Sequence, residues 1–286
     1  MPADDPAPTP TPTPAPSAPA RPAAPMTLVI MIPSPGLVAT PFFNSVIGLT
    51  QDLRGRGIRF ATKTYEFSDI MMSRNYLMSY FLSQKMFSHA LLLDCDLEFG
   101  RSQFFRLMDF NRDFVVAPYA RRQMGIRALQ SALEDNLALP QAERLPPEDV
   151  FARSVGHVVQ RGSSSPGWKR RREGDFVTIA GGGMGFTLIS RRVPEAMVAA
   201  GVVDAYPAQG RFPIFADAPE FHNFFGHKIS PDGTFILGED QSFFHRWILG
   251  CGGEVWADTK ARLVHHGTFG FRGNFAVDRA NDEDPA

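Results

Sequence analysis

The sequence predicts an α/β fold in which a mostly parallel central sheet is flanked by helices. Apolar runs typical of buried strands alternate with segments whose apolar residues recur at helical spacing. This alternation is typical of parallel strands joined by right-handed crossovers. The chain of 286 residues is 44% hydrophobic and 21% charged, which suits one large globular domain and excludes a collagen-like or wholly disordered protein.

Four apolar runs in the first half are expected to be strands, with a helix in each interval between them. The strands are expected over 28–32, 58–64, 89–93 and 114–117, and the helices over 42–53, 73–85 and 103–110. The stripe of the first helix consists of Phe42, Val46, Leu49 and Leu53, and Gly55 and Gly57 end it. Because parallel sheets bind ligands beyond the carboxyl ends of their strands, we expect chemistry just after Ile32, Leu93 and Ala117.

The second half is expected to add an insertion and a further pair of strands. Residues 123–175 form the insertion, which begins as a helix with Leu129, Leu133 and Leu137 on one face. Its second half holds the basic run 169–172, which is either a mobile loop that closes over phosphates or, more commonly, a solvated face. Strand-like runs at 176–180 and 186–189 then flank a glycine-rich bend and indicate a hairpin or strand pair. The phenylalanine-rich stretch 212–225 predicts core, with an acceptor groove as the alternative.

The two ends of the chain differ from the domain between them. Residues 1–25 contain ten of the 24 prolines and predict an extended, solvated arm. This arm has neither the basic start nor the apolar run of a secretory signal. The folded domain is expected over 26–273, and residues 274–286 are expected to be an acidic tail.

Charge and cysteine content exclude several classes of partner. The net charge of -1 argues against nucleic acid as the main partner. No apolar run approaches the roughly 20 residues of a transmembrane helix. The two cysteines, Cys95 and Cys251, form no disulfide framework and favour a cytoplasmic protein, with peripheral attachment to the inner face of the membrane left open.

A pair of carboxylates follows the third expected strand. Asp94 and Asp96 are separated by one residue, so both can lie on the same side of the sheet edge, where they repel unless a cation sits between them. Oxygen ligands suit Mg²⁺ or Mn²⁺, which take substrate phosphates as further ligands. Because Asp-x-Asp arises often by chance, a plain polar turn explains this motif equally well on its own.

Three further motifs each have a structural and a functional explanation. The glycines of residues 181–185 either form a tight bend or let the backbone approach a ligand. Asp240 stands near the start of an apolar-striped helix, where it either caps the helix or acts as a general base. His265 and His266 are either buried structural residues or ligands that complete a carboxylate metal site.

In this order, the motifs resemble those of the GT-A fold nucleotide-sugar glycosyltransferases. They are Asp94-Cys95-Asp96, the glycine-rich loop, Glu239-Asp240 and a C-terminal His-x-Gly in His265-His266-Gly267. The resemblance covers residues 26–273 and implies a GT-A (Rossmann-like) fold with Mn²⁺ or Mg²⁺ as cofactor. It implies a UDP- or GDP-sugar as donor and a saccharide, a lipid-linked sugar or a protein as acceptor.

The resemblance also implies roles for individual residues. The implied metal ligands are Asp94, Asp96 and His265, with Asp96 as the direct carboxylate ligand and His266 as the fallback. The implied donor contacts are Pro33 and Ser34 at the nucleotide base, Arg74 and Asn75 at the base and ribose, Gly182 and Gly183 beside the donor sugar or acceptor, and Arg121 with Arg122 at phosphate or acceptor. A solvated surface pair explains the two arginines equally well.

These parts imply a single-displacement transfer in which Asp240 takes the proton of the acceptor hydroxyl, which makes the enzyme inverting. Glu239 then binds the acceptor or supports the loop. One alternative is a retaining transferase in which Asp240 positions the acceptor, and another is an inactive nucleotide-sugar-binding module. A nucleotidyltransferase is a further alternative, but it needs a basic phosphate loop after the first strand, and residues 33–36 contain no Lys or Arg.

Overall fold

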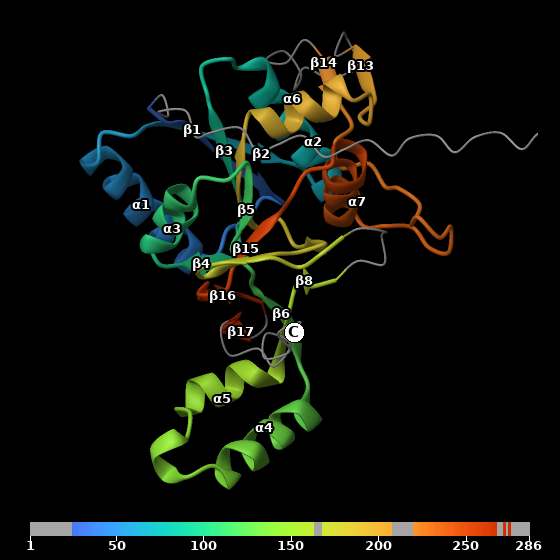
Figure 1. The fold of residues 1–286 in the computed structure, drawn as a ribbon. Coiled ribbons are helices and arrows are strands. Elements are labelled where there is room, and N and C mark those ends of the chain that lie inside the picture. Colours follow the sequence, from blue (N-terminus) through green and yellow to red (C-terminus); the bar gives the residue numbers. More distant parts are fainter. Residues whose placement is uncertain (1–24, 163–167, 208–219, 268–270, 273, 276–286) are drawn as a thin grey trace, which may run out of the picture.

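The computed structural model describes residues 25–162, 168–207, 220–267, 271–272 and 274–275. All but the last residue of the predicted proline-rich arm, most of the predicted acidic tail, and parts of the predicted loop and of the phenylalanine-rich stretch therefore lie outside the described residues. The described chain forms an α/β fold whose main sheet has eight strands and carries helices on both faces (Figure 1). None of the described helices has the length and apolarity that a membrane span requires.

The main sheet is mixed, with the strand order β2-β1-β3-β12-β5-β15-β10-β9. Its strands are β1 (Thr27–Ser34), β2 (Arg59–Glu66), β3 (His89–Leu93), β5 (Phe114–Val116), β9 (Arg172–Glu173), β10 (Phe176–Thr178), β12 (Phe186–Ser190) and β15 (Trp256–Asp258). β1 pairs in parallel with β2 and β3, and β5 pairs in parallel with β15. The other neighbouring pairs are antiparallel.

The prediction of a mostly parallel sheet is therefore wrong for the sheet as a whole. It holds for β2, β1 and β3, which are joined by helical crossovers in the manner of a Rossmann-like fold. β12 instead runs antiparallel to both of its neighbours, β3 and β5.

Helices cover both faces of the sheet and bury two apolar cores. On one face lie α1 (Thr40–Gly55) and α3 (Ser102–Phe110), and on the other α2 (Ile70–Ser83), α6 (Arg192–Ala199) and α7 (Glu239–His245), which continues as a π-helical turn, Arg246–Gly250. Successive side chains of β1 point to opposite faces of the sheet and so enter different cores. Leu28 and Ile30 pack with Leu49 of α1, whereas Val29 and Met31 pack with Phe81 of α2. The predicted strands and helices of the first half are confirmed, with ends that differ by a few residues.

The described residues also form four smaller sheets. They are β4 (Leu97–Phe99) with β16 (Leu263–His265) and β17 (Phe271–Arg272), β6 (Ala120–Met124) with β7 (Val155–His157), β8 (Val159–Gln160) with β11 (Gly181–Gly182), and β13 (Ala205–Pro207) with β14 (Glu220–His222). The predicted pairing across the glycine-rich bend is wrong: β10 and β12 belong to one sheet but are not neighbours, and the first two glycines pair with β8 instead.

The predicted insertion contains a helical hairpin that projects from the sheet (Figure 1). It consists of α4 (Ile126–Ala138), a 3-10 turn (Gln141–Glu143) and α5 (Pro147–Ser154), so the helix predicted from the leucine spacing is confirmed. In the described part of the phenylalanine-rich stretch, Phe224 and Phe225 are fully buried, as the core explanation predicts. The folded region extends beyond residue 273, because Phe275 is completely buried in the core.

Candidate functional site

The two carboxylates after β3 are held by different partners. Asp94 accepts two hydrogen bonds from Arg74 Nη2, at 2.8 and 3.1 Å. Asp96 instead lies against His265 and Arg122, whose Nη1 donates to Asp96 Oδ2 at 3.0 Å. The sequence predicted both carboxylates on one side of the sheet edge, whereas the structure divides them between two adjoining clusters. In the described part of the chain, no three His, Cys, Asp or Glu side chains form a ready-made metal site.

His265 is oriented so that its ring presents one nitrogen to Asp96. The antiparallel pairing of β16 with β4 sets His265 opposite Leu97, next to the second carboxylate. Nδ1 lies 2.8 Å from the carbonyl oxygen of Ala120, a contact in which the ring nitrogen must donate. In the neutral imidazole Nε2 is therefore an acceptor, and it lies 3.3 Å from Asp96 Oδ2.

The chemistry of this pair fits a divalent cation. Asp96 Oδ1 is buried and receives no hydrogen bond from the described residues, and His265 Nε2 lies 3.3 Å from the other oxygen of the same carboxylate. Burial by itself raises the pKa of Asp96, but His265 and Arg122 outweigh it and hold that pKa below its usual value. A carboxylate oxygen with an imidazole nitrogen suits Mn²⁺ better than Mg²⁺, which prefers oxygen ligands.

His266, the fallback ligand, faces away from this pair. Its Nε2 lies 2.9 Å from Glu98 Oε2, and its backbone N–H donates to the carbonyl oxygen of Asp96 at 2.8 Å. Of the two adjacent histidines, the structure therefore brings His265 to the carboxylate and leaves His266 as a support of the loop.

Arg74 is the centre of the second cluster. Its side chain is 3% exposed, and it donates to Asp94, to Glu239 at 3.2 Å and to Asp240. Burial opposes its charge, but Asp240 and Asp94 outweigh that cost and raise the pKa of Arg74 above its usual value. Arg74 thus links the end of β3 to the start of α7.

The two residues expected at the nucleotide base and ribose are engaged inside the protein. Arg74 binds the three carboxylates. Asn75 is 1% exposed, its Nδ2 donates to Asn223 Oδ1 at 2.9 Å, and its Oδ1 accepts from the N–H of Phe225 at 2.8 Å. Both side chains therefore support the site from the interior of the protein.

Asp240 lies in the first turn of α7, where the sequence placed it. Its Oδ1 accepts from Arg74 and its Oδ2 accepts from the N–H of Met184 at 3.1 Å, so neither oxygen caps its own helix. Burial raises the pKa of Asp240 to about 7, with Asp94 and Glu239 adding to the rise and Arg74 opposing it. A carboxyl group with this pKa can exchange a proton near neutral pH.

The glycine-rich bend packs directly against the site. A β-carbon on Gly185 would lie 2.5 Å from Asp94 Oδ2, and one on Gly183 would lie 2.2 Å from Tyr119 Oη. A side chain at either position therefore clashes with a residue of the site. Gly182 pairs in β11, where a β-carbon would lie 3.1 Å from the carbonyl oxygen of Val158. The glycines let the bend close over the carboxylates.

Tyr119 is a site residue that the sequence reasoning missed. It is buried between the two clusters, edge-on to His265 with ring centroids 5.1 Å apart. Burial, with the charges of Asp94 and Asp240, raises its pKa well above the usual value, so it stays protonated. The signal was present, because Tyr119 follows a strand end that the binding rule for parallel sheets had marked.

Two arginines and the first strand border the site. Arg121 and Arg122, on β6, line an open pocket of about 350 Å³ together with His265. Ser34, at the end of β1, accepts from the N–H of Gly36 at 3.1 Å and hydrogen-bonds the thiol of Cys95. Burial and the adjacent aspartates raise the pKa of that thiol to about 11, so it stays protonated. Pro33 precedes Ser34 in the same buried strand end.

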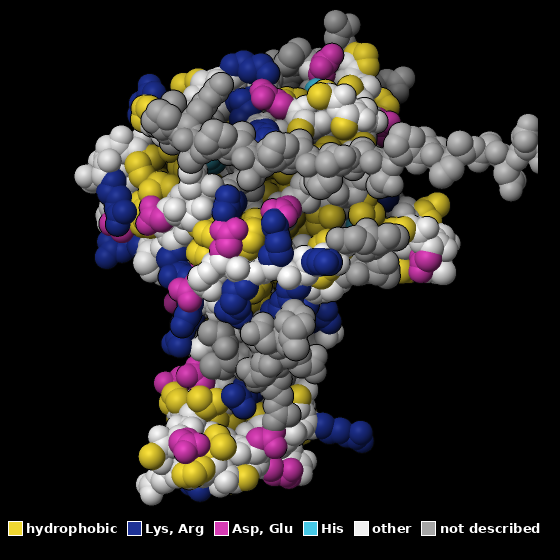
Figure 2. Space-filling model, in the orientation of Figure 1, with side chains coloured by type: hydrophobic (Ala, Val, Ile, Leu, Met, Phe, Trp, Pro, Cys, Tyr) yellow, Lys and Arg dark blue, Asp and Glu magenta, His cyan; other side chains and the backbone are white. Residues whose placement is uncertain are grey.

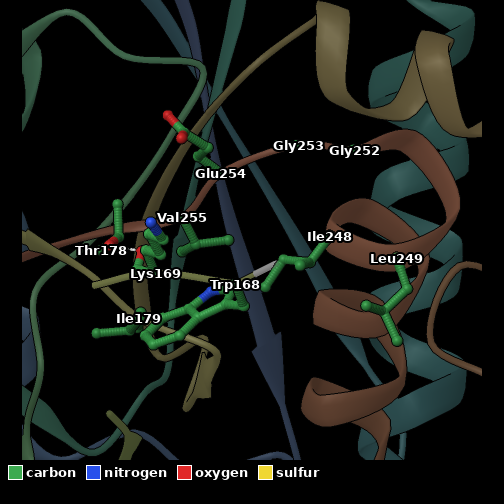
Figure 3. A pocket seen from close by; sticks show the side chains of 10 residues that line it. All are labelled: Trp168, Lys169, Thr178, Ile179, Ile248, Leu249, Gly252, Gly253, Glu254 and Val255. Atoms are coloured by element: carbon green, nitrogen blue, oxygen red, sulfur yellow. Dashed lines mark hydrogen bonds between the residues drawn. The ribbon is translucent and has the colours of Figure 1, made fainter. Parts of the chain in front are cut away.

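A separate cavity of about 230 Å³ lies beside the π-helical turn (Figure 3). Trp168, Ile179, which follows β10, and Ile248 of the π-helical turn line it. None of the carboxylates, histidines or arginines described above contributes to its lining.

Comparisons with known proteins add little. No protein-family model matches the chain, and no curated protein matches it. The solved structures that match include the crystal structure of A197 from STIV, with 16% sequence identity over 85% of this chain and 86% of that chain and a TM-score of 0.43. A likeness this distant carries no argument about function.

Proposed function

We propose that this protein transfers a sugar from a nucleoside-diphosphate sugar to an acceptor hydroxyl, with a divalent cation at Asp96 and His265. The observation that carries the proposal is the meeting of these two residues beside the Arg74 cluster. The pair of Asp96 and His265 lies at the same end of the sheet as the carboxyl group of Asp240, whose pKa is about 7. Departure of a diphosphate requires positive charge, and attack by a hydroxyl requires a base.

Asp96 Oδ1 and His265 Nε2 would hold the cation, and Mn²⁺ fits this donor set better than Mg²⁺. When bound, the cation supplies charge that neutralises the leaving diphosphate. Arg121 and Arg122 line the pocket beside His265 and would bind phosphate oxygens there. Because Arg74 donates to both oxygens of Asp94, we assign Asp94 the role of positioning Arg74.

Asp240 is our candidate for the base that takes the acceptor proton. It can do so because its ordinary low pKa has risen toward neutrality, while Arg74 and the N–H of Met184 hold its two oxygens in a fixed direction. Glu239 reaches the same guanidinium and has a half-buried side chain, so we assign it a supporting role at the acceptor. With Asp240 as base the reaction inverts the anomeric configuration.

The decisive experiment uses the full chain in three steps. A thermal-shift screen with UDP- and GDP-sugars and Mn²⁺ identifies the donor, because a bound ligand raises the melting temperature. Sugar release is then measured with and without acceptor, and NMR defines the anomer of the product. Turnover to the inverted anomer supports the proposal. Binding without turnover would favour a nucleotide-sugar-binding module, and a retained anomer would remove Asp240 from the role of base.

A further inference from the structure

Helix α4 carries an apolar stripe that its own domain leaves uncovered. It packs on α5, and its Ala132 is buried, but Ile126, Leu133 and Leu137 are 77%, 46% and 62% exposed. At about 100° per residue these three side chains fall on one narrow face of the helix. The helix belongs to the hairpin that projects from the sheet (Figure 1), and Figure 2 shows hydrophobic side chains among charged ones on that hairpin. A single exposed leucine is ordinary, but a stripe of three on a projecting helix indicates an interaction surface.

The charges beside the stripe are self-complementary. Arg127 and Glu134 are seven residues, or two helical turns, apart and therefore lie on the same flank of the stripe. Glu134 accepts from Gln130 Nε2 at 2.8 Å, which keeps its carboxylate on that flank. If a second α4 packs antiparallel against the stripe, the Arg127 of each copy meets the Glu134 of the other. The same arrangement seats Leu133 between Ile126 and Gln130 of the second copy.

We propose that α4 pairs antiparallel with α4 of a second copy of this chain, about a two-fold axis that passes between the two helices at the level of residues 130 and 131. A parallel pair would instead set the flank of Arg127 and Glu134 against the opposite flank of the second copy, which carries Leu129 and Asn136 and offers no opposite charge. A lipid surface fits less well, because helices that lie on membranes carry mainly basic residues beside their apolar face, and this flank holds Arg127 with Glu134. A helix of 13 residues is about 20 Å long, so the interface is small and the dimer is expected to be weak.

Analytical ultracentrifugation of the full chain tests this proposal without any substrate. The wild type should show a reversible monomer–dimer equilibrium that weakens at high salt. Leu133→Asp should be monomeric at every concentration. Leu249→Asp is the matched control, because Leu249 has the same 46% exposure on a different part of the surface, and this variant should dimerise like the wild type.

Charge reversal provides the sharper test. Arg127→Glu and Glu134→Arg should each weaken dimerisation at least about tenfold, and the double variant should restore it, because the two-fold axis pairs each altered residue with its altered counterpart. Circular dichroism checks that each variant is folded. A wild type that stays monomeric, a double variant that fails to recover, or a loss of the dimer in Leu249→Asp would overturn the proposal. The proposal would also be overturned if the wild type stayed monomeric and sedimented with anionic phospholipid vesicles, and if Leu133→Asp no longer sedimented with them.

Discussion

Arg74 of α2 and Asp240 of α7 form a direct ion pair although 166 positions separate them in the chain. The same guanidinium holds Asp94 and Glu239, so one cation neutralises part of the charge of three carboxylates. The geometry of the site therefore depends on Arg74, although we do not place Arg74 in contact with the acceptor hydroxyl. Arg74 connects the position of the candidate base to the end of β3.

Removal of the Arg74 charge should destabilise the fold. Arg74→Met is expected to lower the free energy of unfolding by about 3–5 kcal/mol, because it leaves three carboxylates close together without their cation. Urea denaturation at neutral pH measures this change. Arg192→Met is the control, because its side chain is 78% exposed in its ion pair with Asp113, and it should cost at most about 1 kcal/mol. Equal losses in the two variants would show that Arg74 is not the centre of the cluster.

Asp240→Asn should separate binding from chemistry. The substitution keeps the shape of the side chain but removes the group that takes the proton, so transfer should fall by about 10²- to 10⁴-fold. Donor affinity, measured by calorimetry, should change little. Asp109→Asn serves as the control, because Asp109 is an exposed carboxylate on α3. A variant with normal transfer would leave Asp240 with a structural role alone.

The raised pKa of Asp240 also predicts how stability depends on pH. The folded protein keeps the proton of Asp240 up to about pH 7, whereas the unfolded chain loses it near the ordinary value of 3.8. Ionising this residue in the folded state therefore costs stability as the pH rises through that window. Asp240→Asn removes the cost, so the melting temperature of the variant minus that of the wild type should increase from pH 5 to pH 8. Thermal melts across this range measure the difference, and a constant or falling difference would contradict a raised pKa.

The sequence predicted those strands and site residues that are marked by the pattern of neighbouring residues. The apolar runs located β1, β2, β3 and β5, the position after β3 located Asp94 and Asp96, and the stripe of α7 located Asp240. Each of these features depends on neighbours within about ten residues. The direction of β12 was beyond such reasoning, because an apolar strand has the same pattern in either direction.

The partners of Arg74 and the reason for the glycines could not be predicted for a related reason. A buried arginine in a helix gives no local sign of the three carboxylates that it binds, and two of them come from the far end of the chain. Likewise, glycine at 183 is required because Tyr119 occupies the space of its β-carbon, a contact between segments that are far apart in the chain. The sequence left a tight bend and a close approach to a ligand as alternatives for these glycines, and the space beside Gly183 holds the side chain of Tyr119.

The orientation of His265 predicts how Mn²⁺ affects nucleotide binding. Because Ala120 fixes its Nδ1 and leaves Nε2 beside Asp96, His265→Gln should reduce the enhancement of UDP or GDP binding by Mn²⁺ at least about tenfold. His266→Gln is the matched control, since His266 turns to Glu98, and it should keep the full enhancement. Calorimetric titration of each nucleotide with and without Mn²⁺ gives both values. Asp96→Ala should lose the enhancement as His265→Gln does, and if both histidine variants instead behave alike, or if Asp96→Ala keeps the full effect of Mn²⁺, the cation does not bind at this pair.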